Sequence, residues 1–158
     1  MTEIIRPRIV VEERHIASLT PHKRNARTHS AAQIRQIEAS IRQFGFLNPV
    51  LVDEDYRILA GHGRLAAAKA MGWDAVPVIR FDHMSEADKK AYIIADNRLA
   101  EQAGWERELL SLELGAILEE VPDFDLEVTG FAGAELEALL SAAEEADAGG
   151  DADAGFAV

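Results

Sequence analysis

The residues best suited to chemistry form one short stretch, Gly61-His62-Gly63-Arg64, between an apolar segment and a helix-forming segment. Residues 57–60 are typical of a strand, and residues 65–71 are typical of a helix. Where a strand turns directly into a helix, the first backbone N–H groups of the helix lack intrahelical acceptors and lie at the positive end of its dipole. The stretch therefore predicts a site for a phosphate or another anion.

The side chains of this stretch agree with an anion site. Gly61 and Gly63 allow a positive φ and the close approach of a ligand, because no Cβ intervenes. Arg64 carries a planar fork of donors that suits phosphate, although its position in the first turn opposes the helix dipole. One alternative stays open: the glycines make only a tight turn and Arg64 is a solvated charge, since neither the dinucleotide fingerprint nor the Walker loop is present.

Composition excludes several classes of protein. The length of 158 residues suggests one domain of ordinary size plus appendages, and a hydrophobic content of 48% is enough for a real core. No run approaches the roughly 18 apolar residues of a membrane span, and the N-terminus lacks the apolar core of a signal peptide, so we expect a cytoplasmic protein. Without cysteine there is no disulfide, thiolate metal site or thiol chemistry, and the five histidines lack a metal-binding spacing.

The net charge of −12 is unevenly distributed. Residues 1–50 hold eight Lys and Arg against four Asp and Glu, and residues 51–105 hold seven against nine. Residues 106–158 hold one against fifteen, a net charge of −14. Only the basic N-terminal third is therefore expected to attract a polyanion such as DNA, unless the gradient serves solubility alone.

The remaining elements must position the glycine turn. Apolar periodicity and turn residues predict strands at 9–19, 49–52, 57–60 and 75–81, and helices at 30–44, 64–71, 85–99, 105–121 and 133–143. Residues 124–128 alternate like a short strand or an extended linker. The pattern indicates an α/β or α+β core over about 10–100, then an acidic helical appendage over 102–143. The tail 144–158, rich in Ala, Asp, Glu and Gly, is predicted to be disordered.

With these motifs in order, the chain resembles the ParB/sulfiredoxin-fold superfamily, and in particular the ParB N-terminal-like domain. Residues 25–50 match a basic loop and helix; residues 59–72 are similar to the family's Gly-Glu-Arg-Arg phosphate loop; residues 95–101 are similar to its Glu-Asn-x-x-Arg box. The resemblance implies a nucleotide-binding domain over 9–101, built as a small mixed sheet flanked by helices. Gly61-His62-Gly63-Arg64, residues 96–101 and the region Thr129-Gly130-Phe131 together resemble most the type found ahead of phage and bacterial DNA methyltransferases.

The resemblance implies a pocket for CTP or ATP with Mg²⁺. Carried over by position, the phosphate-binding residues are Arg27, Gly61, His62, Gly63, Arg64, Asn97 and Arg98. Gly45, Phe46 and Asn48 are implied on the base side, and Asp96 and Asn97 as oxygen ligands of Mg²⁺. His62 and Asp96 are the implied catalytic residues, with His29 as a further candidate. From the residues alone, Asp96 and Asn97 could equally be a polar helix end, and Arg27 an ordinary loop charge.

Three departures from the family limit what can be carried over. His62-Gly63-Arg64 stands where ParB proteins have Glu-Arg-Arg, so an arginine and a carboxylate are lost, and both the choice of nucleotide and its hydrolysis stay open. Sulfiredoxin needs a cysteine in this turn, where this chain has His62, so its chemistry is excluded. ParB proteins continue into a helix-turn-helix domain, whereas the residues after 101 are strongly acidic, which argues against DNA docking by that segment.

Three classes of function follow from this reading. The first is a nucleotide-binding module of DNA partition or DNA modification, working as a homodimer, with a methyltransferase domain or protein as partner. No methyltransferase motif occurs in the 158 residues. The second is an enzyme, either a weak NTPase or kinase or a ParB-like nuclease. The third is a non-catalytic dimerising module that presents its acidic appendage to a basic partner.

Overall fold

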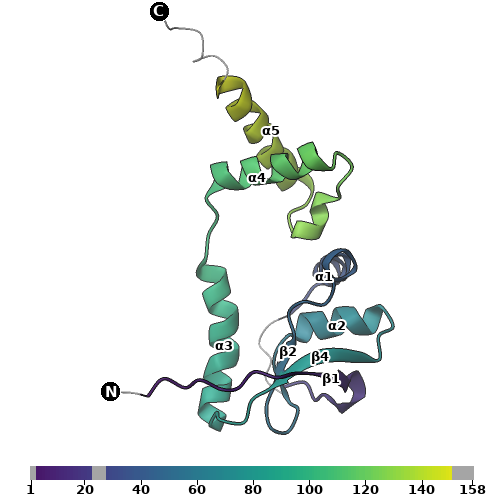
Figure 1. Ribbon diagram of the computed structural model, residues 1–158, viewed down its shortest axis with the longest axis vertical. Coiled ribbons are helices and arrows are strands. Elements are labelled where there is room, and N and C mark those ends of the chain that lie inside the picture. Colours follow the sequence, from purple (N-terminus) through teal and green to yellow (C-terminus); the bar gives the residue numbers. More distant parts are fainter. Residues whose placement is uncertain (1–2, 23–27, 151–158) are drawn as a thin grey trace, which may run out of the picture. The chain divides into compact units, whose positions relative to one another are not determined.

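The glycine turn joins strand β3 (Ile58–Ala60) to helix α2 (His62–Ala70), with Gly61 alone between them. The structure is a computed structural model that describes residues 3–22 and 28–150. The chain divides into two units, Met1–Gln102 and Ala103–Val158 (Figure 1). The other elements of the first unit are β1 (Val11–His15), η1 (Ile16–Ser18), α1 (Ala31–Phe44), β2 (Val50–Val52), β4 (Ala75–Arg80) and α3 (Glu86–Gln102).

The first unit is built on a four-stranded mixed sheet with the strand order β1-β4-β2-β3. β4 pairs antiparallel with β1 and parallel with β2, and β2 pairs antiparallel with β3. Val50 lies opposite Val78 in the parallel pair, and Leu51 lies opposite Ala60 in the antiparallel pair. This arrangement confirms the predicted α+β class with a mixed sheet flanked by helices.

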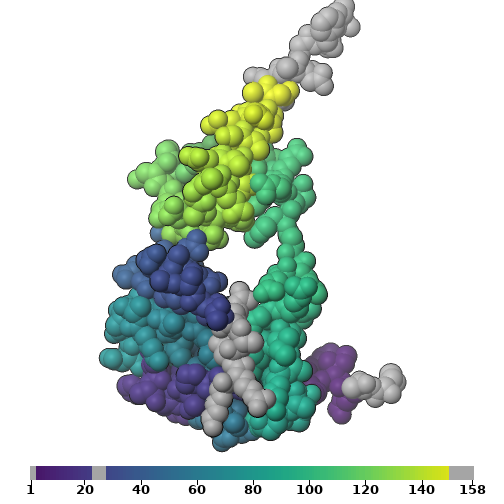
Figure 2. Space-filling view, turned by 180° about the vertical axis from the view of Figure 1, so that it is seen from behind, coloured from purple at the N-terminus to yellow at the C-terminus, as the bar shows by residue number. Residues whose placement is uncertain are grey.

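Helix α2 lies between the sheet and helix α1. Leu65 and Ala68 of α2 belong to the same buried cluster as the central strand residues, which are Val50, Val52, Ile58, Val76 and Val78. The outer helix α1 packs against α2, and Figure 2 shows the two side by side on one face of this unit. Because the middle of α2 is built from alanines, of which Ala67 and Ala68 are completely buried, the helix can approach its neighbours closely.

The ends of α1 follow the predicted signals. The Ser30 Oγ accepts a hydrogen bond from the Gln33 N–H at 3.1 Å, which caps the first turn. Gly45 ends the helix with φ of 92°, and its N–H donates to the Ile41 carbonyl at 2.8 Å. The helix therefore begins and ends where the sequence predicts.

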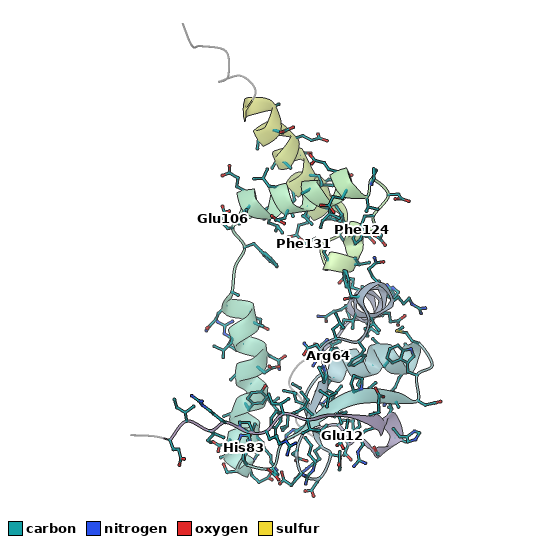
Figure 3. All side chains as sticks on the ribbon, in the orientation of Figure 1. Glu12, Arg64, His83, Glu106, Phe124 and Phe131 are labelled. Carbon is teal, nitrogen blue, oxygen red and sulfur yellow. The ribbon has the colours of Figure 1, made fainter. Side chains whose placement is uncertain are left out.

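The second unit contains α4 (Arg107–Glu120), η2 (Leu126–Thr129) and α5 (Gly133–Gly150). α4 and α5 pack around a buried leucine cluster, Leu114, Leu126, Leu136 and Leu139. Phe124 and Phe131, which are labelled in Figure 3, pack against this cluster. No helix in the described ranges is long and apolar enough to cross a membrane.

Several predicted boundaries differ from the structure. Residues 144–150, predicted as disordered, continue helix α5, because Ala and Glu are strong helix formers; residues 151–158 lie outside the described residues. Residues 126–129 form the 3-10 helix η2 rather than a strand, since the Asp125 side chain accepts from the Glu127 N–H at 3.0 Å. The strand predicted over 9–19 is confined to Val11–His15.

Candidate functional site

The start of α2 presents backbone donors. Gly61 is the N-cap residue and takes the left-handed conformation, with φ of 107°. The first intrahelical bond runs from the Leu65 N–H to the Gly61 carbonyl at 2.9 Å, so the N–H groups of His62, Gly63 and Arg64 precede it. Within the described residues, no hydrogen bond from these three N–H groups to another element is found. The predicted cluster of open amides is therefore present.

Both glycines of the turn are closely surrounded. A Cβ on Gly61 would lie 3.0 Å from a terminal nitrogen of Arg64 and 3.3 Å from the backbone Cα of Val50. A Cβ on Gly63 would lie 2.9 Å from the His29 ring. The distance at Gly63 is shorter than real Cβ contacts, and those at Gly61 are tighter than most of them, so the glycines allow Arg64 and His29 to come against the turn.

Arg64 is a partly buried cation with spare donors. One of its terminal nitrogens donates to the Pro49 carbonyl at 3.1 Å, but its Nε is buried without a hydrogen-bond partner among the described residues. Burial lowers the pKa of the guanidinium, whereas Asp96 and Tyr92 act to raise it. A buried donor without a partner is costly, so this arginine is suited to an anion that fills the gap. Figure 3 shows Arg64 at the end of α2 that faces α3.

Imidazoles gather around the same turn. The His22 N–H donates to His62 Nε2 at 3.4 Å, and His29 Nδ1 lies 3.1 Å from the Gln33 side-chain oxygen. Burial lowers the pKa of His62, and the nearby His22 and His29 rings lower it further. His62 is therefore neutral at neutral pH, which is the form that can accept a proton.

Asp96 and Asn97 reach the site from α3. The Tyr92 hydroxyl donates to Asp96 Oδ1 at 3.5 Å, and the Asn97 Nδ2 donates to the Ile93 carbonyl one turn earlier at 2.8 Å. Within the described residues, no group of three or more His, Asp or Glu side chains is placed to hold a metal ion. A Mg²⁺ ion here would thus depend on oxygens that a phosphate ligand brings, as is usual for Mg²⁺.

These parts enclose one cavity of about 350 Å³. It is lined by α1 and the segment before it, by the β3–α2 turn and by the second half of α3: His29, Gln33, Ile37, Asn48, Leu59, Ala60, Gly61, His62, Gly63, Arg64, Asp96, Asn97 and Ala100. The predicted phosphate residues 61–64 and the predicted metal residues Asp96 and Asn97 are therefore brought together.

The predicted base-side residues line a second cavity of about 350 Å³ beside the first. Gly45, Phe46 and Asn48 contribute to it, and most of the rest of its wall is apolar. The two cavities share Ile37, Asn48 and Arg64, so Arg64 lies where they meet. A polar cavity joined to an apolar one could hold an ionic group and a flat ring together.

One predicted phosphate residue is not brought to the cavity by the structure. Arg98 does not line it, and Arg98 instead pairs with Glu101 at 3.4 Å. Successive residues of a helix differ by about 100° in direction, so a helix that turns Asp96 and Asn97 toward the cavity turns Arg98 away. Arg27 lies outside the described residues.

A group of charges around Lys89, at the start of α3, was not predicted from the sequence. Lys89 and Asp53 are both buried and in contact, although Asp53 falls between two predicted strands and Lys89 in a predicted helix, where charged residues are usually solvated. A signal did exist, because Lys89 lies one turn before Ile93 and therefore on the apolar face of its helix. The sequence also did not predict that Gln33 and Ile37 line the cavity or that Tyr92 contacts Asp96.

Comparisons with known protein families cover most of the chain. Residues 6–97 match the ParB N-terminal domain, and residues 108–157 match the ParB-methyltransferase HTH domain. The second match corrects our interpretation of the acidic segment as a departure from the family's helix-turn-helix region. Helix-turn-helix architecture depends on the spacing of apolar residues along the helices, and acidic surface residues leave that spacing intact.

Relatives of known name match part of the chain. The chain is 47% identical over 77 residues to the ParB-like nuclease domain-containing protein YnaK of Escherichia coli, covering 49% of this chain and 88% of that protein. It is 30% identical over 97 residues to a nucleoid occlusion protein of Bacillus cereus, covering 58% of this chain. In that case the match spans 33% of the relative's length.

Solved structures share the fold. The chromosome-partitioning protein ParB of Caulobacter crescentus, crystallised with CTP-gamma-S, aligns with a TM-score of 0.67 at 21% identity, over 80% of this chain and 74% of that one. A Pnob8-like ParB-N domain aligns with a TM-score of 0.51 at 20% identity, over 77% of this chain and 50% of that one.

Proposed function

Because the chain belongs to the family of the ParB N-terminal domain, we propose that its first unit binds a nucleoside triphosphate, CTP or ATP, together with Mg²⁺. The observation that carries the proposal is the cavity in which the open amides of residues 61–64, Arg64 and Asp96 meet. The ParB structure with CTP-gamma-S supports a nucleotide as the guest, since it shares this fold. The module would serve DNA partition or DNA modification.

The phosphate groups would bind at the start of α2. The N–H groups of His62, Gly63 and Arg64 offer donors at the positive end of the helix, and phosphate accepts such donors readily. The unsatisfied Nε of Arg64 would gain a charge-assisted bond. Arg27 is kept in this proposal as a further phosphate ligand, and Arg98 is left out because it pairs with Glu101.

Mg²⁺ would be held by Asp96 and Asn97 together with phosphate oxygens. Asp96 is an exposed carboxylate on the wall of the cavity, which agrees with the preference of Mg²⁺ for one or two carboxylates plus phosphates. The ion would supply positive charge to the phosphates. Gly45, Phe46 and Asn48 would face the base, in the apolar cavity beside Arg64.

Two other parts of the chain support a role at DNA. The match of residues 108–157 to the ParB-methyltransferase HTH domain supports a role at DNA, and the basic residues 1–50 are the part of the chain that would attract it. A homodimer and a methyltransferase partner complete the proposal.

Slow hydrolysis of the bound nucleotide is a second candidate function, favoured by His62. His62 lines the same cavity as Asp96, and an imidazolium formed there when phosphate binds could donate a proton to the leaving phosphate. Phosphate release should then fall to background in a His62→Gln, Asp96→Asn double variant. Activity that survives both substitutions would exclude this assignment, and a plasmid-nicking assay with the same variant tests the nuclease activity suggested by the relative's name.

Calorimetry with CTP, ATP, GTP and UTP, each with and without Mg²⁺, tests the proposed function. We expect one site per chain for CTP or ATP and tighter binding when Mg²⁺ is present. The absence of heat with all four nucleotides would remove the proposal.

A further inference from the structure

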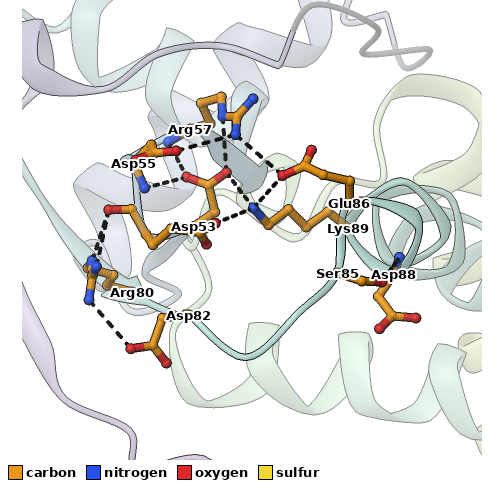
Figure 4. Close-up of polar contacts among 10 residues, drawn as sticks. Asp53, Asp55, Arg57, Arg80, Asp82, Ser85, Glu86, Asp88 and Lys89 are labelled. Carbon is orange, nitrogen blue, oxygen red and sulfur yellow. Dashed lines mark hydrogen bonds and ion pairs between the residues drawn. The ribbon is translucent and has the colours of Figure 1, made fainter.

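Lys89 lies in the first turn of α3 and is 3% exposed. Its ammonium group contacts three carboxylates, at 2.7 Å from Glu54 Oε1, 2.9 Å from Glu86 Oε1 and 3.3 Å from Asp53 Oδ2 (Figure 4). Hydrogen bonds to Glu54, and then to Glu86 and Asp53, raise the pKa of Lys89 against the effect of burial. Lys89 is therefore charged at neutral pH.

Asp53 fixes the other side of this contact. Its Oδ1 accepts the N–H groups of Asp55 at 2.8 Å and Arg57 at 2.9 Å, and its Oδ2 accepts from the Arg57 Nε at 3.1 Å. These bonds define the turn between β2 and β3. Since Lys89 contacts both Asp53 and Glu54 of this turn, the ammonium group joins the start of α3 to the sheet (Figure 4).

The face of α3 that carries Lys89 also carries the metal residues. Lys89, Ile93, Asp96, Asn97 and Ala100 are spaced so that they lie along one side of the helix. Ile93 is buried, but none of residues 94–102 is. The buried positions of α3 therefore lie in its first two turns, and the part that lines the cavity is half-buried or exposed.

We propose that Lys89 is a positioning residue of the nucleotide site, which holds α3 in the register that places Asp96 and Asn97 opposite the phosphate turn. The inference rests on the proposed function, because it assigns Lys89 a role in the Mg²⁺ side of that site. A buried ammonium can do this because its three acceptors lie in defined positions, so a shift or rotation of α3 would leave a charge buried and unpaired.

The alternative role is stability alone, and the phosphate side of the site separates the two. The amides of residues 61–64 lie on α2, which Lys89 does not contact in the described residues. Loss of positioning should therefore weaken the Mg²⁺-dependent part of binding and spare binding without metal. Loss of stability should weaken both.

The test is calorimetry of Lys89→Met with CTP and ATP, with and without Mg²⁺. Lys90→Met is the matched control, because Lys90 is the exposed neighbour on the same helix. We expect Lys89→Met to lose about tenfold or more of the Mg²⁺-dependent affinity, as removal of groups that orient a metal ligand does. In an Asp96→Asn background the same substitution should have no further effect, since the two changes act on one interaction.

Hydrogen exchange measures the positioning without any nucleotide. In Lys89→Met, amides of residues 93–100 should exchange faster while those of α1 and α2 keep their rates. If the wild type binds no nucleotide but this exchange pattern appears, the proposed function fails and the positioning of α3 stands. Two results would overturn the inference. One is unchanged exchange in residues 93–100 of Lys89→Met. The other is a loss of affinity in Lys89→Met that is equal with and without Mg²⁺, both in the wild-type and in the Asp96→Asn background.

A milder variant covers the case in which Lys89→Met does not fold. Glu86→Gln removes one negative charge from the exposed side of the cluster, where the carboxylate also contacts Arg57 at 3.5 Å. The buried pair of Lys89 and Asp53 is left in place. We expect the same selective loss of Mg²⁺-dependent affinity, smaller in size, and an equal loss in the absence of Mg²⁺ would contradict it.

Discussion

The guanidinium of Arg64 and the carboxylate of Asp96 face the same cavity, although one belongs to the first turn of α2 and the other to α3. Asp96 acts to raise the pKa of Arg64, which burial lowers on balance. No ion pair joins the two within the part of the chain that the structure describes. A cation and an anion separated by a cavity suit a guest with both signs of charge, as a metal-bound triphosphate is.

Gly61→Ala tests the turn itself. Its φ of 107° is unfavourable for alanine, and the new Cβ would meet the guanidinium of Arg64. We expect a loss of about 1–2 kcal/mol in the free energy of unfolding, as for other left-handed positions, and loss of nucleotide binding. Gly72→Ala is the control, because Gly72 has φ of 78° but open space around it. That variant should lose similar stability in thermal unfolding and keep its affinity.

Arg64→Met separates binding from stability. The substitution removes one hydrogen bond to the Pro49 carbonyl, about 1 kcal/mol, and also removes a cation whose burial is unfavourable. The melting temperature should therefore change little while nucleotide affinity falls about tenfold or more, as for a lost charge-assisted contact. Arg42→Met, at an exposed position of α1, should alter neither quantity. A large drop in melting temperature with unchanged affinity would show that Arg64 is structural.

Nucleotide binding should take up a proton at His62. Its pKa lies below 6.5 because of burial and of the nearby His22 and His29, so the neutral form is favoured in the folded protein. The stability that this neutral form contributes is present above pH 6.5 and is lost as the pH falls from there through the folded pKa. A bound phosphate favours the imidazolium instead, so affinity should rise as the pH falls from about 8 to about 6.

Calorimetry in buffers of different ionisation enthalpy measures this proton uptake. His62→Gln should abolish the larger part of it, and His83→Gln, which changes an exposed histidine outside the cavity, should leave it intact. Equal uptake in the wild type and in His62→Gln would assign the proton to another group.

Asp96→Asn should remove the Mg²⁺ dependence of binding. Without metal, the variant should bind nucleotide as well as or better than the wild type, because a negative charge has been taken from the wall that faces the phosphates. Asp88→Asn, at the exposed start of the same helix, should keep the full Mg²⁺ dependence. Titration of Mg²⁺ at fixed nucleotide gives the comparison, and an unchanged Mg²⁺ response in Asp96→Asn would place the ion elsewhere.

The sequence predicted the local parts of the site well, for physical reasons. A glycine with positive φ between a strand and a helix leaves a clear signal, and Gly61 takes that conformation. Ser30 and Gly45 bound α1 as predicted, because capping depends only on neighbouring residues. The mixed-sheet topology and the approach of α3 to the glycine turn were predicted from the family resemblance, because local pattern does not specify long-range pairing.

Other features depend on tertiary contacts that no local pattern encodes. Lys89 reads as a solvated charge until the turn at Asp53 and Glu54 is placed against it. Arg98 was carried over with its motif, yet the rotation of α3 directs it to Glu101 rather than to the cavity. In the second unit, acidic charge was given more weight than the spacing of leucines such as Leu114 and Leu139, which pack in one cluster.

The amide resonances of His62, Gly63 and Arg64 provide the most direct test, followed by NMR while CTP or ATP is added with Mg²⁺. The account predicts that these three backbone N–H groups shift more than those of the rest of the first unit, and that Gly61→Ala removes the response. Binding of nucleotide that leaves these three resonances in place, or no response to any nucleoside triphosphate, would contradict it.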